Sequence, residues 1–91
     1  MPSLLKIPLT ESQKNLLQRK EITTMVEPEV KRALSAISSE GTTYSLHLNP
    51  GDLDDLIGMI CFVANHEAYD SKLVRELDLL AVHLEQFLDK K

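Results

Sequence analysis

Hydrophobic residues are densest in one run, residues 56–64, where every residue is apolar or glycine. Asn49 precedes this segment as a good N-cap, Pro50 suits the first helical position, and three aspartates follow where a helix dipole favours anions. We therefore expect a helix over residues 50–66. Its main apolar stripe consists of Leu53, Leu56, Ile57, Ile60 and Ala64.

This helix has a second apolar side, formed by Met59 and Phe62. A helix that is apolar all round is normally buried all round. A chain of 91 residues offers few elements to surround one helix, so two explanations stay open. Either the helix is the centre of a compact fold, or its second side meets another subunit.

The end of the chain predicts a second long helix, capped by Asp70 and spanning residues 71–89. We expect it to pack antiparallel to helix 50–66, so that the two form a helical hairpin. Leu79 and Val82 lie outside its inner face. That inner face consists of Leu73, Leu77, Leu80, Ala81, Leu84, Phe87 and Leu88.

Residues 4–9 and 42–48 alternate apolar and polar positions, as strands do, and Pro8 favours an edge position for the first. Two shorter helices are expected over residues 10–20 and 28–39. Thr10 and Gln13 have capping-box spacing at the start of the first, and Gly41 is the expected stop after the second. The pattern predicts one mostly helical α+β domain, residues 1–91, in which the two strands pair beneath the helices.

Charge is unevenly distributed along the chain, whose net charge is −4. Residues 1–41 hold six basic and five acidic residues (+1), and residues 42–91 hold four and nine (−5). The acidic second half disfavours a nucleic-acid surface there, because such binding depends on neutralising phosphates. One cysteine excludes an intrachain disulfide. The first residues lack the apolar core of a signal peptide and no run could span a membrane, so we expect a soluble, cytoplasmic protein.

No catalytic, cofactor or metal site is expected from these residues, and we expect no enzyme. Cys61 lies mid-helix among apolar residues, which favours a core position over a reactive thiol. The three histidines lack the close spacing of a metal-ligand pair, and we place His83 on the outer side of the last helix. Residues 52, 54 and 55 are aspartates at a helix N-terminus, without the spacing of a calcium loop.

Residues 44–78 combine a strand, a capped Asp-Leu-x-x-Leu-Ile-Gly helix start, the triplet Ala64-Asn65-His66 and a leucine-rich final helix. This combination resembles a small bacterial segment that occurs alone or attached to plasmid- and transposon-borne passenger proteins. The resemblance implies a bacterial origin and a helical accessory module. It assigns no residue a catalytic role.

Two functional hypotheses follow. The first is an interaction module that forms a homodimer, or binds a partner helix, through the hairpin of residues 50–89, with Met59, Phe62, Leu79 and Val82 as contacts. The second is a nucleic-acid accessory protein of a mobile element, for which a basic patch in residues 14–32 supplies the contacts. Its members would be Lys14, Arg19, Lys20, Lys31 and Arg32.

Overall fold

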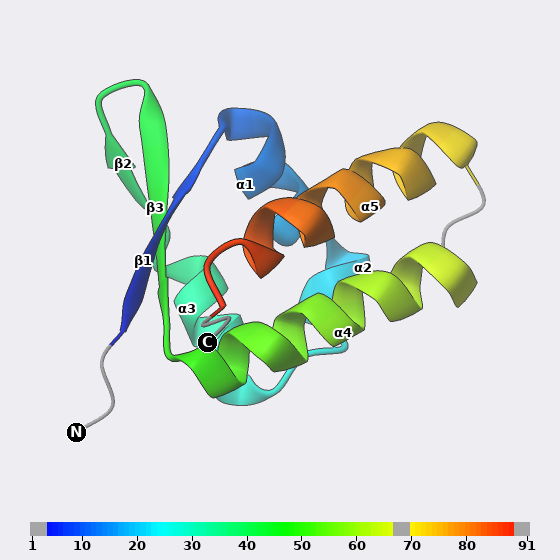
Figure 1. The fold of residues 1–91 in the computed structure, drawn as a ribbon, viewed down its shortest axis with the longest axis horizontal. Helices are drawn as coiled ribbons and strands as arrows, with labels where there is room; N and C mark the ends of the chain where they lie inside the picture. Colours follow the sequence, from blue (N-terminus) through cyan, green and yellow to red (C-terminus); the bar gives the residue numbers. More distant parts are fainter. Residues whose placement is uncertain (1–3, 67–69, 89–91) are drawn as a thin grey trace.

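The computed structural model of this chain describes residues 4–66 and 70–88. A small antiparallel sheet stands at one end of the molecule, and two long helices extend side by side from it (Figure 1). The predicted α+β, mostly helical fold is confirmed. Two of its elements were not predicted from the sequence, a third strand and a fifth helix.

The sheet has the strand order β1-β3-β2, with β1 at Leu5–Leu9, β2 at Ser38–Glu40 and β3 at Thr43–Leu48. β1 and β3 are the two predicted strands, and they pair with Ile7 opposite Leu46. Pro8 lies in an edge strand, as predicted, because a proline cannot donate a ladder hydrogen bond. The inward side chains of both strands enter the core.

The predicted helix 28–39 is wrong at its C-terminal end. Helix α3 covers Pro28–Ser35, and Ser38–Glu40 instead forms β2, which pairs with β3. Gly41 has φ +67° in the tight turn between β2 and β3, so it serves a hairpin rather than a helix end. All three residues of β2 are exposed, which is why no apolar alternation marks this strand in the sequence.

The predicted helix 10–20 is divided into α1 (Glu11–Leu17) and α2 (Lys20–Thr23). The capping box at its start is confirmed: Gln13 N donates to Thr10 Oγ1 (3.1 Å), and Thr10 N donates to Gln13 Oε1 (2.8 Å). The break follows Gln18, whose side-chain amide donates to the carbonyl of Leu34 (3.0 Å). This bond ties the break to α3.

Helices α4 (Pro50–His66) and α5 (Ser71–Glu85) form the predicted hairpin. Asn49 Oδ1 accepts from Asp52 N (2.8 Å), and Asp70 Oδ1 accepts from Lys72 N (3.0 Å). Both predicted caps are therefore present. The last helix ends at Glu85 rather than at residue 89, which lies outside the described residues.

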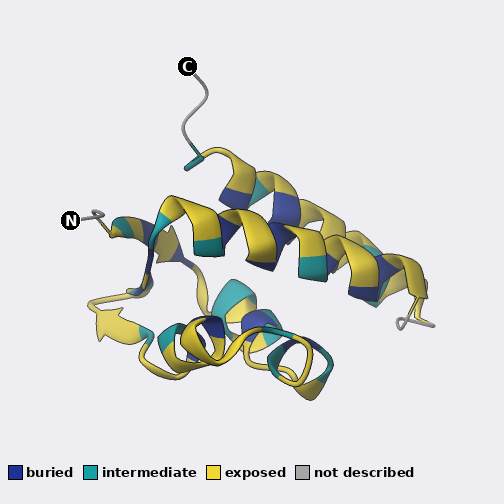
Figure 2. Cartoon of the chain, turned by 90° about the horizontal axis from the view of Figure 1, so that it is seen from below, coloured by how far each residue is buried: buried dark blue, intermediate teal, exposed yellow. Residues whose placement is uncertain are grey.

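The core lies between two layers (Figure 2). α4 and α5 form one layer, and α2 and α3 contact α4 from the other side. The buried residues come from every helix and from β1 and β3, and Leu53, Leu56 and Ile60 of α4 are 0% exposed. Because only one layer lies beneath the hairpin, the outer sides of α4 and α5 face solvent.

Two polar contacts join strand β1 to its surroundings, one to β2 and one to α5. Lys6 Nζ in β1 lies 3.0 Å from Glu40 Oε1 in β2, so this ion pair crosses β3 on the outer face. His83 Nε2 on α5 donates to the carbonyl oxygen of Pro8 at 2.8 Å. The placement of His83 on the outer side of the last helix is therefore wrong, because its ring reaches the edge strand.

Candidate interaction surface

The outer side of α5 carries two exposed apolar side chains. Leu79 is 63% exposed and Val82 is 55% exposed, although the opposite side of this helix contributes Leu77, Leu80 and Leu84 to the core. The two residues are three positions apart, so their side chains lie one helical turn from each other. Within the described residues, both side chains are much more exposed than those of the core.

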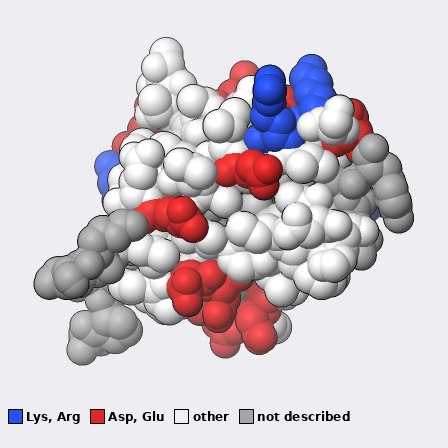
Figure 3. All heavy atoms as spheres, turned by 45° about the vertical axis from the view of Figure 1, so that its right-hand side comes forward, with Lys and Arg blue, Asp and Glu red and all other residues white. Residues whose placement is uncertain are grey.

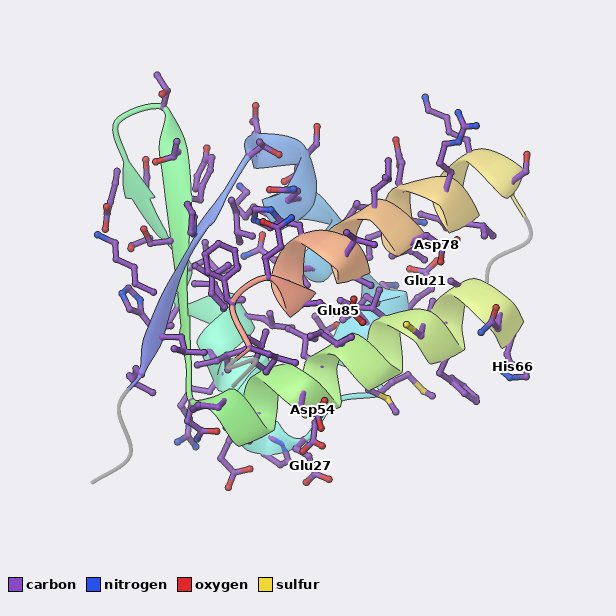
Figure 4. The ribbon with its side chains drawn as sticks, in the orientation of Figure 1. Glu21, Glu27, Asp54, His66, Asp78 and Glu85 are labelled. Atoms are coloured by element: carbon purple, nitrogen blue, oxygen red, sulfur yellow. The ribbon has the colours of Figure 1, made fainter. Side chains whose placement is uncertain are left out.

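The other two predicted contacts lie together on α4. Met59 is half-buried, and Phe62, three positions on, is 38% exposed. The ring of Phe62 lies 4.5 Å from that of His66 (centroid to centroid), and His66 lies at the end of α4, on the side turned from α5 (Figure 4). The four predicted contacts therefore form two pairs, one on each helix.

A hollow of about 210 Å³ lies beside Met59, between α4 and the segment that joins α2 to α3. Val30 and Leu56 are buried in its floor, and Met25, which is 41% exposed, lies opposite Met59. The hollow is lined by Met25, Val26, Glu27, Val30, Asp55, Leu56 and Met59.

No pattern in the sequence indicates this hollow, because Met25 and Val26 lie in a segment without helical or strand periodicity. The charged residues that line the hollow are all acidic. Two carboxylates, those of Glu27 and Asp55, lie on its wall, and no lysine or arginine lines it. Figure 4 shows Glu27 beneath the first half of α4, on the side away from α5.

Cys61 is exposed, so its predicted core position is wrong. The residue lies within the run that is apolar on all sides, but it points about 80° away from Leu53 at 100° per residue. The core lies beneath only one side of α4, and Cys61 falls outside that side. An apolar run therefore did not mean burial at each of its positions.

The predicted basic residues are distributed over three helices and a loop, and two of them already have partners. Lys14 Nζ lies 4.6 Å from the centroid of the Tyr44 ring, and an Arg19 guanidinium nitrogen lies 3.2 Å from Glu21 Oε2. The backbone N–H of Glu21 and then Arg19 lower the pKa of that carboxyl. Nucleic-acid binding stays a prediction, and these contacts do not favour it. The remaining three, Lys20, Lys31 and Arg32, are exposed.

Within residues 4–66 and 70–88, no group of three or more His, Cys, Asp or Glu side chains is placed to hold a metal ion. No helix in the same part of the chain is both long enough and apolar enough to cross a membrane. The surface features that remain for a functional argument are the two apolar pairs and the hollow.

Comparison with models of protein families, with curated protein sequences and with solved structures finds no significant match. The resemblance of residues 44–78 to a bacterial segment therefore stays a prediction. Function has to be argued from the surface geometry itself.

Proposed function

We propose that this chain is a non-catalytic interaction module that associates with copies of itself through the outer side of the α4–α5 hairpin. The observation that supports this proposal is the exposure of Leu79 and Val82, at 63% and 55%, on a helix whose other side contributes buried leucines to the core. Single exposed apolar residues are common on protein surfaces. Here the exposed apolar residues are grouped in pairs on the outer sides of two adjacent helices, and grouped apolar residues mark interaction sites.

Association would remove these side chains from water. Fully burying a valine, leucine, phenylalanine or methionine side chain contributes about 1.5–3 kcal/mol. Association also loses translational and rotational freedom and orders side chains, so only part of this gain remains as affinity. A homodimer is the smallest assembly that could cover at least one of these pairs on each copy.

Sedimentation velocity of the Leu79→Asp/Val82→Asp variant tests this proposal. An aspartate at either position would have to be buried without a partner in the assembly, so we expect the variant to sediment as a monomer while the wild type associates. Both positions are exposed, so circular dichroism should show an unchanged fold.

Leu4→Asp is the matched control, because Leu4 is 61% exposed, lies before β1 and belongs to neither apolar pair. It should sediment like the wild type. If the wild type and the Leu79→Asp/Val82→Asp variant sediment identically, the outer side of α5 takes no part in association and the proposal is wrong.

A further inference from the structure

The outer stripes of α4 and α5 share one spacing. On α4 the stripe runs through Asp55, Met59 and Phe62, and on α5 the residues twenty positions later are Arg75, Leu79 and Val82. Both sets advance by four and then three residues, which is the spacing with which one helix meets another along its length. The match continues in both directions, with Asp52 and Lys72 before these sets and His66 and Gln86 after them.

Most residues of both stripes are exposed, while Asp52 and Met59 are half-buried. Phe62, Leu79 and Val82 are among the exposed large apolar residues, and Asp55 and Arg75 are exposed as well. At 100° per residue, Phe62 lies about 180° from Leu53 on α4, and on α5 Leu79 lies about 160° from Leu77. Leu53 and Leu77 are core residues, so each stripe is the side of its helix turned from the core.

The charges of the two stripes are complementary. The α4 stripe contains two aspartates and neither lysine nor arginine, whereas the α5 stripe contains Lys72 and Arg75 and no acidic residue. In both stripes the charges come first and the apolar residues follow. Two such stripes laid parallel and in register would place Asp52 by Lys72, Asp55 by Arg75, Met59 by Leu79 and Phe62 by Val82.

In a single copy α4 and α5 run in opposite directions, so Asp52 and Asp55 near the start of α4 lie at the other end of the hairpin from Lys72 and Arg75 near the start of α5. Figure 3 shows basic side chains at the upper edge of one face, and acidic side chains beside them, across the middle and along the lower edge. Within one copy α4 and α5 are also antiparallel neighbours, so they cannot make the parallel contact themselves. A stripe of the opposite charge, laid parallel, would therefore have to come from a second copy of the chain.

The hollow beside α4 offers a place for an apolar side chain at this register. It opens between Met25 and Met59, with the buried Val30 and Leu56 as its floor. Methionine side chains are unbranched and adapt their shape to an incoming group. Leu79 of a second copy, aligned with Met59, would enter the hollow next to the carboxylates of Glu27 and Asp55.

We propose that α5 of one copy docks along α4 of the next copy, parallel and in this register, with Leu79 in the Met25–Met59 hollow. This inference rests on the proposed self-association and adds its geometry. The contact is head-to-tail, because it uses a different surface on each copy. In a dimer one stripe of each copy stays uncovered and can bind a further copy. Assembly therefore continues beyond a dimer into a ring or a chain of copies.

Mixing two variants tests the head-to-tail geometry. Phe62→Asp disables the α4 stripe and leaves the α5 stripe intact, and Leu79→Asp does the reverse. Each variant alone should remain a monomer, because each lacks one half of the contact. An equimolar mixture should form a 1:1 complex with twice the 10.3 kDa mass of the chain in native mass spectrometry, and no larger species.

The outcomes separate this inference from the proposed function. If the wild type associates but the mixture stays monomeric, the contact is not head-to-tail and this inference is overturned while self-association stands. If the wild type is itself a monomer, both are overturned. Leu4→Asp mixed with either variant is the control for adventitious association. It retains both stripes, so its mixtures should contain species larger than a dimer.

Charge reversal gives a second readout that leaves the apolar residues in place. Asp55→Arg should weaken association at least about tenfold, because it places like charges opposite each other at the Arg75 position. Adding Arg75→Asp in the same chain restores opposite charges in every contact, so affinity should recover. If the double variant binds as weakly as Asp55→Arg alone, these two residues do not face each other and the register is wrong.

Discussion

Leu56 and Leu79 have the same side chain in opposite surroundings. Leu56 is 0% exposed in the core, whereas Leu79 is 63% exposed on α5. We expect Leu56→Ala to lower the free energy of unfolding by about 2–5 kcal/mol, because it removes buried methyl groups and leaves a cavity. Leu79→Ala should change it by no more than about 0.5 kcal/mol. Urea unfolding at low protein concentration measures both. Equal losses would contradict the described arrangement of core and surface.

The pKa of the Glu40 carboxylate reports on contacts between the strands of the sheet. Hydrogen bonds from Lys6 and then Ser45 hold the pKa of Glu40 below its ordinary value of 4.5. Because the folded-state pKa is lowered, this contribution to stability is present above the unfolded pKa and is lost as pH falls through the folded value. NMR titration should find the Glu40 pKa below 4.5 in the wild type.

In the Lys6→Met variant that pKa should move up towards 4.5, because the first of its two hydrogen-bond donors is gone. Glu21, whose pKa is lowered by its backbone N–H and then by Arg19, is the internal control, and Lys6→Met should leave that pKa unchanged. An unchanged Glu40 pKa in the variant would mean that Lys6 does not contact the carboxylate in solution.

At the scale of elements, we expect replacement by alanine to have opposite effects on stability at Gly41 and at Gly58. Gly41 has φ +67° in the β2–β3 turn, so Gly41→Ala should destabilise the protein by about 1 kcal/mol or more. Gly58 lies in the middle of α4, and an added Cβ would meet nothing within 4 Å. Gly58→Ala should therefore stabilise it by up to about 1 kcal/mol.

Thermal unfolding of the two glycine variants decides this prediction, with a lower Tm for Gly41→Ala and a higher Tm for Gly58→Ala. The same direction of change in both would show that the turn, or the helix, is not built as described.

The elements that could be predicted from sequence are those with both a cap and an apolar period. Helix α4 has Asn49 before it and a continuous stripe from Leu53 to Ala64, so both of its ends were predicted. Strand β2 has neither signal, because Ser38–Glu40 is held by backbone pairing to β3 and buries no side chain. The division of helix 10–20 coincides with a contact distant in sequence, from Gln18 to the Leu34 carbonyl.

The surface was predictable to a lesser extent. The sequence indicated that Met59, Phe62, Leu79 and Val82 exceed what the two main stripes need. It could not show that Met25, thirty-four positions earlier in the chain, would lie opposite Met59 across a hollow. Tertiary packing sets that contact, and so does the exposure of Cys61.

At the scale of the whole molecule, charge separation predicts a salt dependence. If Asp55 and Arg75 of adjacent copies face each other at the rim of the contact, salt screens their attraction. Raising NaCl from about 0.05 M to about 0.5 M should weaken wild-type association, since the Debye length falls well below 10 Å over this range. Analytical ultracentrifugation measures the change.

The variant with both Asp55→Ala and Arg75→Ala is the control for this salt effect. It should associate more weakly at low salt and respond less to added salt. Association of the wild type that strengthens throughout the same range would show that apolar burial alone holds the copies together, without the complementary charges.

The mass of the wild-type chain in solution, followed by light scattering over a dilution series, tests the central claim most directly. The claim that the outer side of the α4–α5 hairpin binds a second copy predicts a mass above 10.3 kDa that rises with concentration. A mass of 10.3 kDa at every concentration would contradict it, and the exposed residues of α5 would then not mediate self-association.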